Sequence, residues 1–204
     1  MSSEFWNEKY SVSGFRYGTA PNAFVAEHAR DYFEAGERVL CLGAGEGRNA
    51  VWLAEQGYGV TAVEQSSAGI DKMLALAAER EVSVDVIHAD VGEFEPEEGG
   101  YAGVVLSYLH VGPELRPVLH AKACAALAPG GAVVLEAFRP EQLERDSGGP
   151  PDESMLYTEE LLREDFGELE LALAESTTIE LDEGQGHRGR GEVVRIIAVK
   201  PGES

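Results

Sequence analysis

Three glycines, Gly43, Gly45 and Gly47, have the residue type and the spacing that could place a ligand against the main chain. Glycine lets the backbone turn sharply and leaves room for a ligand to touch the peptide groups. The apolar run 38–42 before them is typical of a strand, and the run 49–56 after them is typical of a helix whose free amide groups point toward the turn. In an open parallel sheet, ligands bind at the carboxyl ends of the strands. The turn therefore predicts a ligand-binding loop, with a plain strand–helix connection as the alternative.

Acidic residues near the ends of the next two expected strands indicate a cofactor that contains a nucleoside. Glu64 ends the run that begins at position 59, and its carboxylate can accept hydrogen bonds from both hydroxyls of a ribose. Asp90 can accept a hydrogen bond from an adenine amino group, while the Val91 amide can donate to the ring. The alternative for Asp90 is a helix or turn cap. NAD enzymes place an acid similarly, but their G-x-G-x-x-G spacing needs a glycine where this chain has Arg48.

Two histidines and an arginine are candidates for the reacting end of such a site. His187 and Arg188 fall in the glycine-rich stretch 183–191, and His110 follows the fourth expected strand. A neutral histidine near pH 7 can remove a proton from a thiol or an amine. An arginine can orient an anion by paired hydrogen bonds. The alternatives are a solvated hairpin turn for the first two residues and a hydrogen-bonded histidine at a strand end for His110.

The elements that must position these residues alternate between strand and helix up to residue 138. Strands are predicted at 38–42, 59–63, 82–87, 102–106 and 132–135. Helices are predicted at 21–33, at 49–56, from 66, and from 113 to the Pro-Gly-Gly sequence 129–131. A mobile loop or lid is predicted at 139–157, then a helix at 159–166, and then strands at 169–181 and 193–199 around the glycine-rich turn. This order predicts one domain over 1–204, an α/β fold with a doubly wound, seven-stranded, mostly parallel sheet and a C-terminal antiparallel hairpin.

Charge and composition restrict the partners. The 37 acidic and 16 basic residues give a net charge of −21, which repels the phosphate backbone of nucleic acids. No apolar run approaches the ~20 residues of a membrane span, and the polar N-terminus does not resemble a signal peptide. Cys41 and Cys124 lie in apolar stretches and are expected in the core, and no residue spacing suggests a metal site. We expect a cytoplasmic protein, a monomer or weak homodimer, that acts on a small molecule without nucleic acid or membrane partners.

Motifs spread over most of the chain resemble those of a known family. They include Phe5-Trp6-Asn-Glu-Lys-Tyr10, Tyr17-Gly18-Thr-Ala-Pro21-Asn22, Gly43-Ala-Gly-Glu-Gly-Arg-Asn-Ala50, Gly57-Tyr-Gly-Val-Thr-Ala-Val63, Pro140-Glu-Gln-Leu143, Ser147-Gly-Gly-Pro150 and Leu181-Asp-Glu-Gly184 with His187. The chain resembles the class I S-adenosylmethionine-dependent methyltransferases, in particular the tellurite-resistance/thiopurine-methyltransferase-like branch.

The resemblance implies S-adenosylmethionine as the cofactor, with the N-terminal segment 1–20 closing over it and the 184–191 turn bringing His187 and Arg188 to the substrate. Many relatives carry an acid at the position of Cys41, where it helps to hold the methionine amino group. Here that role is expected to pass to Glu46, or to backbone carbonyls and water. Motif and resemblance together assign cofactor binding to Trp6, Tyr17, Gly43, Ala44, Gly45, Gly47, Arg48, Glu64, Gln65, Asp90, Val91 and Ser107.

The expected function is therefore methyl transfer to a small nucleophile: a thiol, a halide or a metalloid oxyanion. Catalysis would come mainly from proximity and alignment, with His187, Arg188 or His110 assisting. Two other function classes stay open from the sequence, an NAD(P)-dependent oxidoreductase and a non-catalytic module that binds S-adenosylmethionine. Arg48 and the C-terminal hairpin argue against the oxidoreductase.

Overall fold

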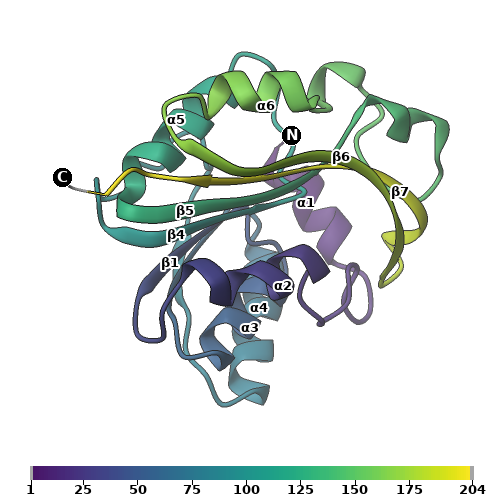
Figure 1. Cartoon of the computed structure of the whole chain (residues 1–204). Coiled ribbons are helices and arrows are strands. Elements are labelled where there is room, and N and C mark those ends of the chain that lie inside the picture. The colour runs from purple at the N-terminus through teal and green to yellow at the C-terminus, as the bar shows by residue number, and fades with distance from the viewer. Residues whose placement is uncertain (1, 203–204) are drawn as a thin grey trace.

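Seven strands form one sheet in the computed structural model, which describes residues 2–202 (Figure 1). Their order across the sheet is β3-β2-β1-β4-β5-β7-β6. The first five strands of the chain are parallel, and β7 is antiparallel to both β5 and β6. The strands span β1 Arg38–Leu42, β2 Gly59–Glu64, β3 Asp85–His88, β4 Tyr101–Ser107, β5 Leu127–Phe138, β6 Glu170–Glu183 and β7 His187–Val199. The predicted seven-stranded sheet with its C-terminal hairpin is confirmed.

Helices cover both faces of this sheet (Figure 1). They span α1 Ser3–Tyr10, α2 Ala23–Tyr32, α3 Arg48–Glu55, α4 Ser67–Glu79, α5 Arg116–Ala126 and α6 Glu159–Asp165, with short 3-10 helices at Pro140–Glu144 and Glu153–Met155. Alternate residues of β1 point to opposite faces: Leu40 packs with the cluster under α5 and α6, and Val39 packs with the cluster under α2, α3 and α4. Because both faces are buried, the central strands are continuously apolar rather than alternating. No helix within residues 2–202 has the length and apolarity needed to cross a membrane.

The order of the strands fixes where a ligand can bind. From β1 the chain moves outward on one side to β2 and β3, and then returns to the other side of β1 as β4. The loops that follow β1 and β4 therefore lead in opposite directions and leave a crevice beyond the carboxyl ends of these two strands. The loop after β1 begins with Gly43, and the loop after β4 begins with Tyr108.

Several elements differ from the sequence predictions. The third strand begins at Asp85 rather than 82, and the helix α1 was not predicted. Helix α5 ends at Ala126, and the sequence 129–131, expected to stop it, lies inside β5. Glycine fits there because a Cβ on Gly131 would lie 2.8 Å from the carbonyl oxygen of Ala102, and the Lys200 amide donates to the Gly131 carbonyl at 2.8 Å.

The hairpin turn is also shorter than predicted. Strands β6 and β7 continue to Glu183 and from His187, which are paired in register, so that only residues 184–186 form the turn. Arg188 and Arg190 are therefore strand residues that face Asp182 and Glu180 across the hairpin. Because neighbouring residues of a strand point to opposite faces, this pairing decides which side chains of the hairpin can reach the site.

The segment 139–157, predicted to be a loop or lid, is anchored to the hairpin. Glu192 of β7, which is 3 % exposed, accepts hydrogen bonds from Arg139 and Arg145 at 2.6 Å each. Hydrogen bonds from Arg145, opposed by burial, bring the pKa of Glu192 to about 2. Tyr157 is buried at the far end of the segment. Between these anchors, residues 148–151 reach the crevice, and a lid function for them stays a prediction.

Candidate functional site

A cavity of about 420 Å³ lies beyond the carboxyl ends of β1 and β4. This volume falls within the range of roughly 300–1,000 Å³ that is typical of small-molecule sites. Its wall combines the glycine turn, the N-terminal segment, the end of β4, the loop 148–151 and the hairpin turn. The cavity is thus assembled from segments far apart in the sequence.

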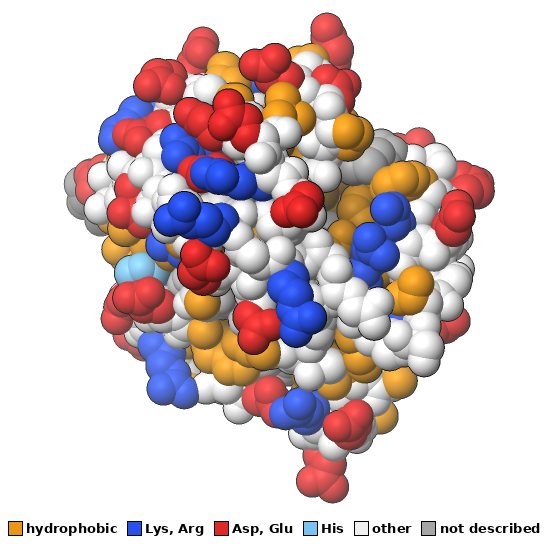
Figure 2. All heavy atoms as spheres, turned by 90° about the vertical axis from the view of Figure 1, so that its right-hand side faces the viewer, with side chains coloured by type: hydrophobic (Ala, Val, Ile, Leu, Met, Phe, Trp, Pro, Cys, Tyr) orange, Lys and Arg blue, Asp and Glu red, His pale blue; other side chains and the backbone are white. Residues whose placement is uncertain are grey.

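Figure 2 shows one face of the molecule, on which Lys and Arg side chains are interspersed with Asp and Glu side chains.

The glycine turn has the conformation that its residue type predicts. The φ angles of Gly43, Gly45 and Gly47 are 63°, 58° and 88°, in the left-handed region that side chains rarely adopt. A Cβ on Gly45 would lie 2.9 Å from the hydroxyl of Tyr10. A Cβ on Gly47 would lie 2.4 Å from Cγ of Met73 in α4, so Gly47 lets two helices approach and does not itself line the cavity. The other predicted residues of the turn, Gly43, Ala44, Gly45 and Arg48, do line it.

Glu64, at the end of β2, holds the glycine turn in place. Its carboxylate accepts hydrogen bonds from the Gly45 amide at 2.7 Å and from the Ser66 amide at 2.8 Å. Burial raises the pKa of Glu64, and these hydrogen bonds oppose the shift. A carboxylate has about four lone pairs, so Glu64 keeps the capacity to accept from a ligand in the cavity that it lines.

The remaining residues expected around the cofactor also reach the cavity wall: Gln65, Asp90, Val91 and Ser107. One oxygen of Asp90 accepts from the Gly92 amide at 2.7 Å, so Asp90 caps a turn and borders the cavity at once. The hydroxyl of Ser107 is buried and has no hydrogen-bond partner among residues 2–202. An orphaned polar atom in a cavity wall is the kind of group that a bound polar ligand satisfies.

The N-terminal segment closes one side of the cavity through aromatic contacts. The Trp6 ring stacks on Tyr10 with centroids 5.4 Å apart, Tyr10 contacts Tyr17 edge-on at 6.4 Å, and Tyr17 contacts the His187 ring at 4.5 Å. The predicted cofactor residues Trp6 and Tyr17 both line the cavity. Sequence analysis missed Arg16 in the same segment, whose buried Nε has no partner in the described part of the chain.

Glu46 has a different role from the one expected. Instead of pointing a free carboxylate at a ligand, it accepts from the Arg16 amide at 2.7 Å and from the Lys72 ammonium at 2.7 Å. It therefore fastens the N-terminal segment to the glycine turn. Burial raises the pKa of the neighbouring Cys41 thiol to about 12, so that this side chain is a neutral part of the wall.

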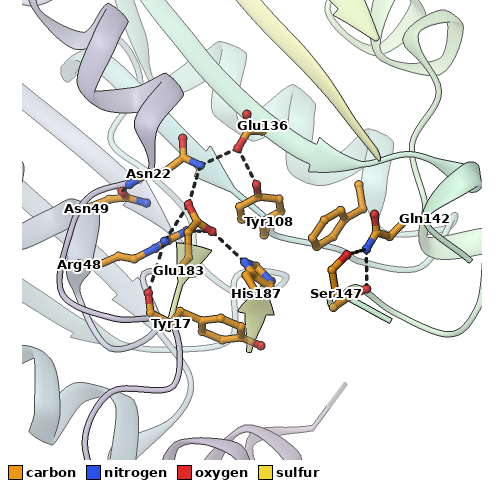
Figure 3. Close-up of polar contacts among 12 residues, drawn as sticks. Tyr17, Asn22, Arg48, Asn49, Tyr108, Glu136, Gln142, Ser147, Glu183 and His187 are labelled. Carbon is orange, nitrogen blue, oxygen red and sulfur yellow. Dashed lines mark hydrogen bonds and ion pairs between the residues drawn. The ribbon is translucent and has the colours of Figure 1, made fainter. Parts of the chain in front are cut away.

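His187 has the geometry of a neutral base. Its Nδ1 donates to the Glu183 carboxylate at 2.9 Å, and Glu183 in turn forms an ion pair with Arg48 at 2.9 Å and accepts a hydrogen bond from it at 3.0 Å (Figure 3). No residue within 2–202 makes a hydrogen bond with Nε2 of His187, and the ring lines the cavity. Burial lowers the pKa of His187, and the Glu183 carboxylate opposes that shift. Sequence analysis missed Glu183, which only the pairing of the hairpin brings beside His187.

His110, the rival candidate, has both ring nitrogens occupied. Its Nδ1 donates to the Met155 carbonyl at 2.7 Å, and its Nε2 accepts from the Phe138 amide at 3.1 Å. Burial lowers its pKa to about 4. Although His110 borders the cavity, its hydrogen bonds match the alternative prediction of a structural histidine at a strand end.

Arg188 is not brought into the site. Its side chain is 80 % exposed, lies 3.9 Å from Asp182, and does not line the cavity. The physical reason is the register of the hairpin: consecutive strand residues point to opposite faces, so that the inward position of His187 turns Arg188 outward. The expectation of a loose turn carrying both residues was wrong on this point.

The pKa of His110 predicts how stability depends on pH. The unfolded state binds a proton near the ordinary pKa of 6.5 and the folded state only near 4, so the free energy of unfolding falls as pH drops from 6.5 to 4. In His110→Leu this slope should become shallower, and the unpaired Met155 carbonyl and Phe138 amide should cost about 1–3 kcal/mol each. Urea unfolding at several pH values measures both effects. An unchanged slope in His110→Leu would contradict the assignment.

Comparison with known proteins agrees with this geometry. Residues 39–131 match the family described as "Methyltransferase domain". A 2-heptyl-1-hydroxyquinolin-4(1H)-one methyltransferase of Mycobacteroides abscessus is 32 % identical over 117 residues, which are 55 % of this chain and 51 % of that protein. The chain spans about half the length of the curated relatives it matches.

Solved structures show the same fold. TehB from Haemophilus influenzae superposes with a TM-score of 0.72 at 20 % identity, over 97 % of this chain and 66 % of that one. Magnesium protoporphyrin IX methyltransferase from Synechocystis, solved with bound S-adenosylmethionine, superposes with a TM-score of 0.67 at 15 % identity, over 97 % and 96 % of the two chains. The resemblance found in the motifs is thereby confirmed. Residues 39–131 match the methyltransferase domain family, and the chain has the fold of the class I S-adenosylmethionine-dependent methyltransferases.

Proposed function

We propose that this protein binds S-adenosylmethionine in the cavity and transfers its methyl group to a small-molecule nucleophile. One observation carries the proposal: the glycine turn with Glu64 and Asp90 lines the same cavity as the unpartnered Nε2 of His187. A cofactor-binding wall and a base thus face one space. The family match over 39–131 supports the same conclusion.

The residues of the wall fit this cofactor. Glu64 would accept from the ribose hydroxyls, and Asp90 with the Val91 amide would bind the adenine. The unpartnered polar groups of Arg16 and Ser107 would meet the charged methionine end, where Arg16 suits a carboxylate. Bound there, the cofactor supplies a methyl group already activated by a sulfonium. The protein itself contributes alignment and exclusion of water, which can be worth ~7–11 kcal/mol of the barrier.

The acceptor is expected among the small nucleophiles that the sequence suggested: thiols, halides and metalloid oxyanions. The curated relative from Mycobacteroides abscessus is named for a hydroxylated quinolone, which adds acidic hydroxyl groups to that range. A cytoplasmic location and a monomeric or weakly dimeric state stay predictions.

Calorimetric titration with S-adenosylhomocysteine and with NADH tests the proposal. We expect saturable heat with the first ligand and none with the second. Binding of NADH alone would favour the oxidoreductase. If S-adenosylhomocysteine binds but labelled methyl groups reach no acceptor, the protein is instead a binding module.

Glu64→Ala should weaken binding of S-adenosylhomocysteine by about 1–3 kcal/mol, since the ribose hydroxyls and the Gly45 amide both lose their acceptor. Calorimetry measures the change. Glu79→Ala, which alters an exposed acid at the end of α4, is the control and should bind like the wild type. Equal affinity of Glu64→Ala and wild type would contradict the assignment of this carboxylate.

A further inference from the structure

We infer that the methyl acceptor is a neutral aromatic molecule whose reacting hydroxyl or thiol gives its proton to Nε2 of His187, with Glu183 and Arg48 as positioning residues. The inference rests on the proposed methyl-transfer function and narrows its substrate class. It rests on three features of the cavity: the orientation of one imidazole, the charges around it, and the shape of the wall beside it.

The orientation of His187 is fixed by its partners. A carboxylate can only accept, so the 2.9 Å contact with Glu183 places the ring proton on Nδ1 and leaves Nε2 as an acceptor. Glu183 is itself held by both terminal nitrogens of Arg48. Figure 3 shows these three side chains joined in a row, with Tyr17 and Tyr108 on either side of the imidazole. An acceptor that carries a proton can therefore donate it to Nε2.

The charges around His187 disfavour an anionic acceptor. The charge of the Arg48 guanidinium is neutralised by its ion pair with Glu183, and Arg188 points away from the cavity. Two further cations of the wall, Lys9 and Arg16, belong to the N-terminal segment, and Arg16 suits the cofactor carboxylate. A halide or an oxyanion beside His187 would thus have the Glu183 carboxylate near it and no unpaired cation from the hairpin.

The wall beside His187 is built from aromatic rings whose planes lie at 50–85° to the imidazole. The rings of Tyr17 and Tyr108 lie with centroids 4.5 Å from the imidazole, and that of Phe138 lies at 5.2 Å. Across from them, a Cβ on Gly148 would lie 2.7 Å from Cδ2 of His187, so only glycine lets the loop 148–151 come this close. The three aromatic rings, together with Pro150 and Pro151 of that loop, offer stacking surface to a planar acceptor.

The chemical step balances without a further reactant. The electron pair of the acceptor O–H or S–H bond becomes available as the proton moves to Nε2, and the oxygen or sulfur forms a bond to the methyl carbon. The bond from that carbon to the sulfonium sulfur breaks, and its electron pair stays on sulfur. The products are a methyl ether or thioether, a neutral thioether from the cofactor and a protonated His187, which then returns its proton to water.

The experiment measures methyl transfer to 2-naphthol, phenylmethanethiol, iodide and selenite at saturating S-adenosylmethionine, at a pH where both aromatic compounds are neutral. We expect transfer to the two aromatic compounds only. His187→Gln should lower kcat for 2-naphthol by roughly 10²–10⁴-fold with unchanged affinity for S-adenosylhomocysteine, while His28→Gln, altering the half-buried histidine of α2, should behave like the wild type.

Glu183→Gln tests the positioning role by its pH profile. The rise of kcat with pH reports the pKa of His187, and Glu183 opposes the lowering of that pKa. The rising part of the plot of kcat against pH should therefore move to lower pH in Glu183→Gln. A purely structural role of Glu183 would not cause this shift. The titratable and charged groups around the imidazole are Glu183, Arg48, Glu136, Tyr17, Tyr108 and His110.

Several outcomes would overturn the inference. Transfer to iodide or selenite that is lost in Arg16→Gln but retained in His187→Gln would assign an anionic acceptor to the N-terminal segment. Binding of S-adenosylhomocysteine without transfer to either aromatic compound would also refute it. Failure of the proposed function is recognised separately: S-adenosylhomocysteine then either does not bind, or binds while none of the four compounds, aromatic or anionic, accepts a methyl group.

Discussion

Gly45→Leu is expected to abolish binding of S-adenosylhomocysteine, with a loss of more than about 100-fold in affinity, or roughly 3 kcal/mol. The φ of Gly45 is 58°, and a Cβ there would lie 2.9 Å from the Tyr10 hydroxyl. The larger side chain must therefore enter the cavity or displace the N-terminal segment. Its amide would also shift away from Glu64, to which it donates at 2.7 Å. Calorimetric titration measures the affinity.

Backbone strain alone has to be separated from the loss of the binding surface. Gly99 offers a matched control, since its φ is 65° and nothing lies within 4 Å of the Cβ it would carry. Gly99→Leu should lower the melting temperature and leave affinity unchanged. If Gly45→Leu keeps its affinity while circular dichroism shows a native fold, the cofactor does not bind at this turn.

The fold was predictable because its signals are local. Buried parallel strands are continuously apolar, and glycines or caps mark where the helices begin and end, as at Gly47 and Ser66. The Pro-Gly-Gly sequence 129–131 misled the prediction because its usual meaning is a turn. Here Gly130 and Gly131 instead exchange backbone hydrogen bonds with Lys200, a contact that the local sequence does not encode.

That the residues expected around the cofactor line one cavity was predictable for the same reason, and the placement of the two histidines and of Arg188 was not. Glu64 ends β2 and Asp90 follows the end of β3 by two residues, and the neighbours of both strands follow from the topology. The roles of His187, Arg188 and His110 depend on the register of the hairpin and on the loop 139–157. A shift of one residue exchanges the inward and outward faces of a strand, so residue types alone could not separate His187 from Arg188.

Glu136→Ala is expected to lower the free energy of unfolding by about 3–5 kcal/mol, because it removes the buried carboxylate that pairs with Arg195 and that accepts from the Tyr108 hydroxyl and the Asn22 amide. Glu136 in β5 is 1 % exposed, and its carboxylate accepts from Nε of Arg195 at 2.6 Å, from the Tyr108 hydroxyl at 2.7 Å and from the Asn22 amide at 2.6 Å. Total stability of a domain is about 5–15 kcal/mol, so this loss is large. Urea unfolding measures it, and a loss below about 1 kcal/mol would contradict the assignment.

The matched control removes the other partner of the same arginine. Glu175 contacts Arg195 at 3.3 Å and is 46 % exposed. Because solvent screens such a pair, Glu175→Ala should cost only about 0–1 kcal/mol. Each variant removes one carboxylate from the same guanidinium, so the contrast measures what burial and the hydrogen bonds from Tyr108 and Asn22 add to the role of Glu136.

A double variant separates the two roles of Glu136, as the partner of Arg195 and as the support of the cavity wall. Removing both charges in Glu136→Leu with Arg195→Met should recover most of the stability, since apolar replacements of a buried ion pair are often neutral or stabilising. Methyl transfer should stay impaired, because Tyr108 has a φ of 52°, a conformation that costs a non-glycine residue about 1–3 kcal/mol, and its hydroxyl is held by Glu136. Once released, the ring would leave the position beside His187 that shapes the acceptor site. Recovery of stability and activity together would instead show that Glu136 serves Arg195 alone.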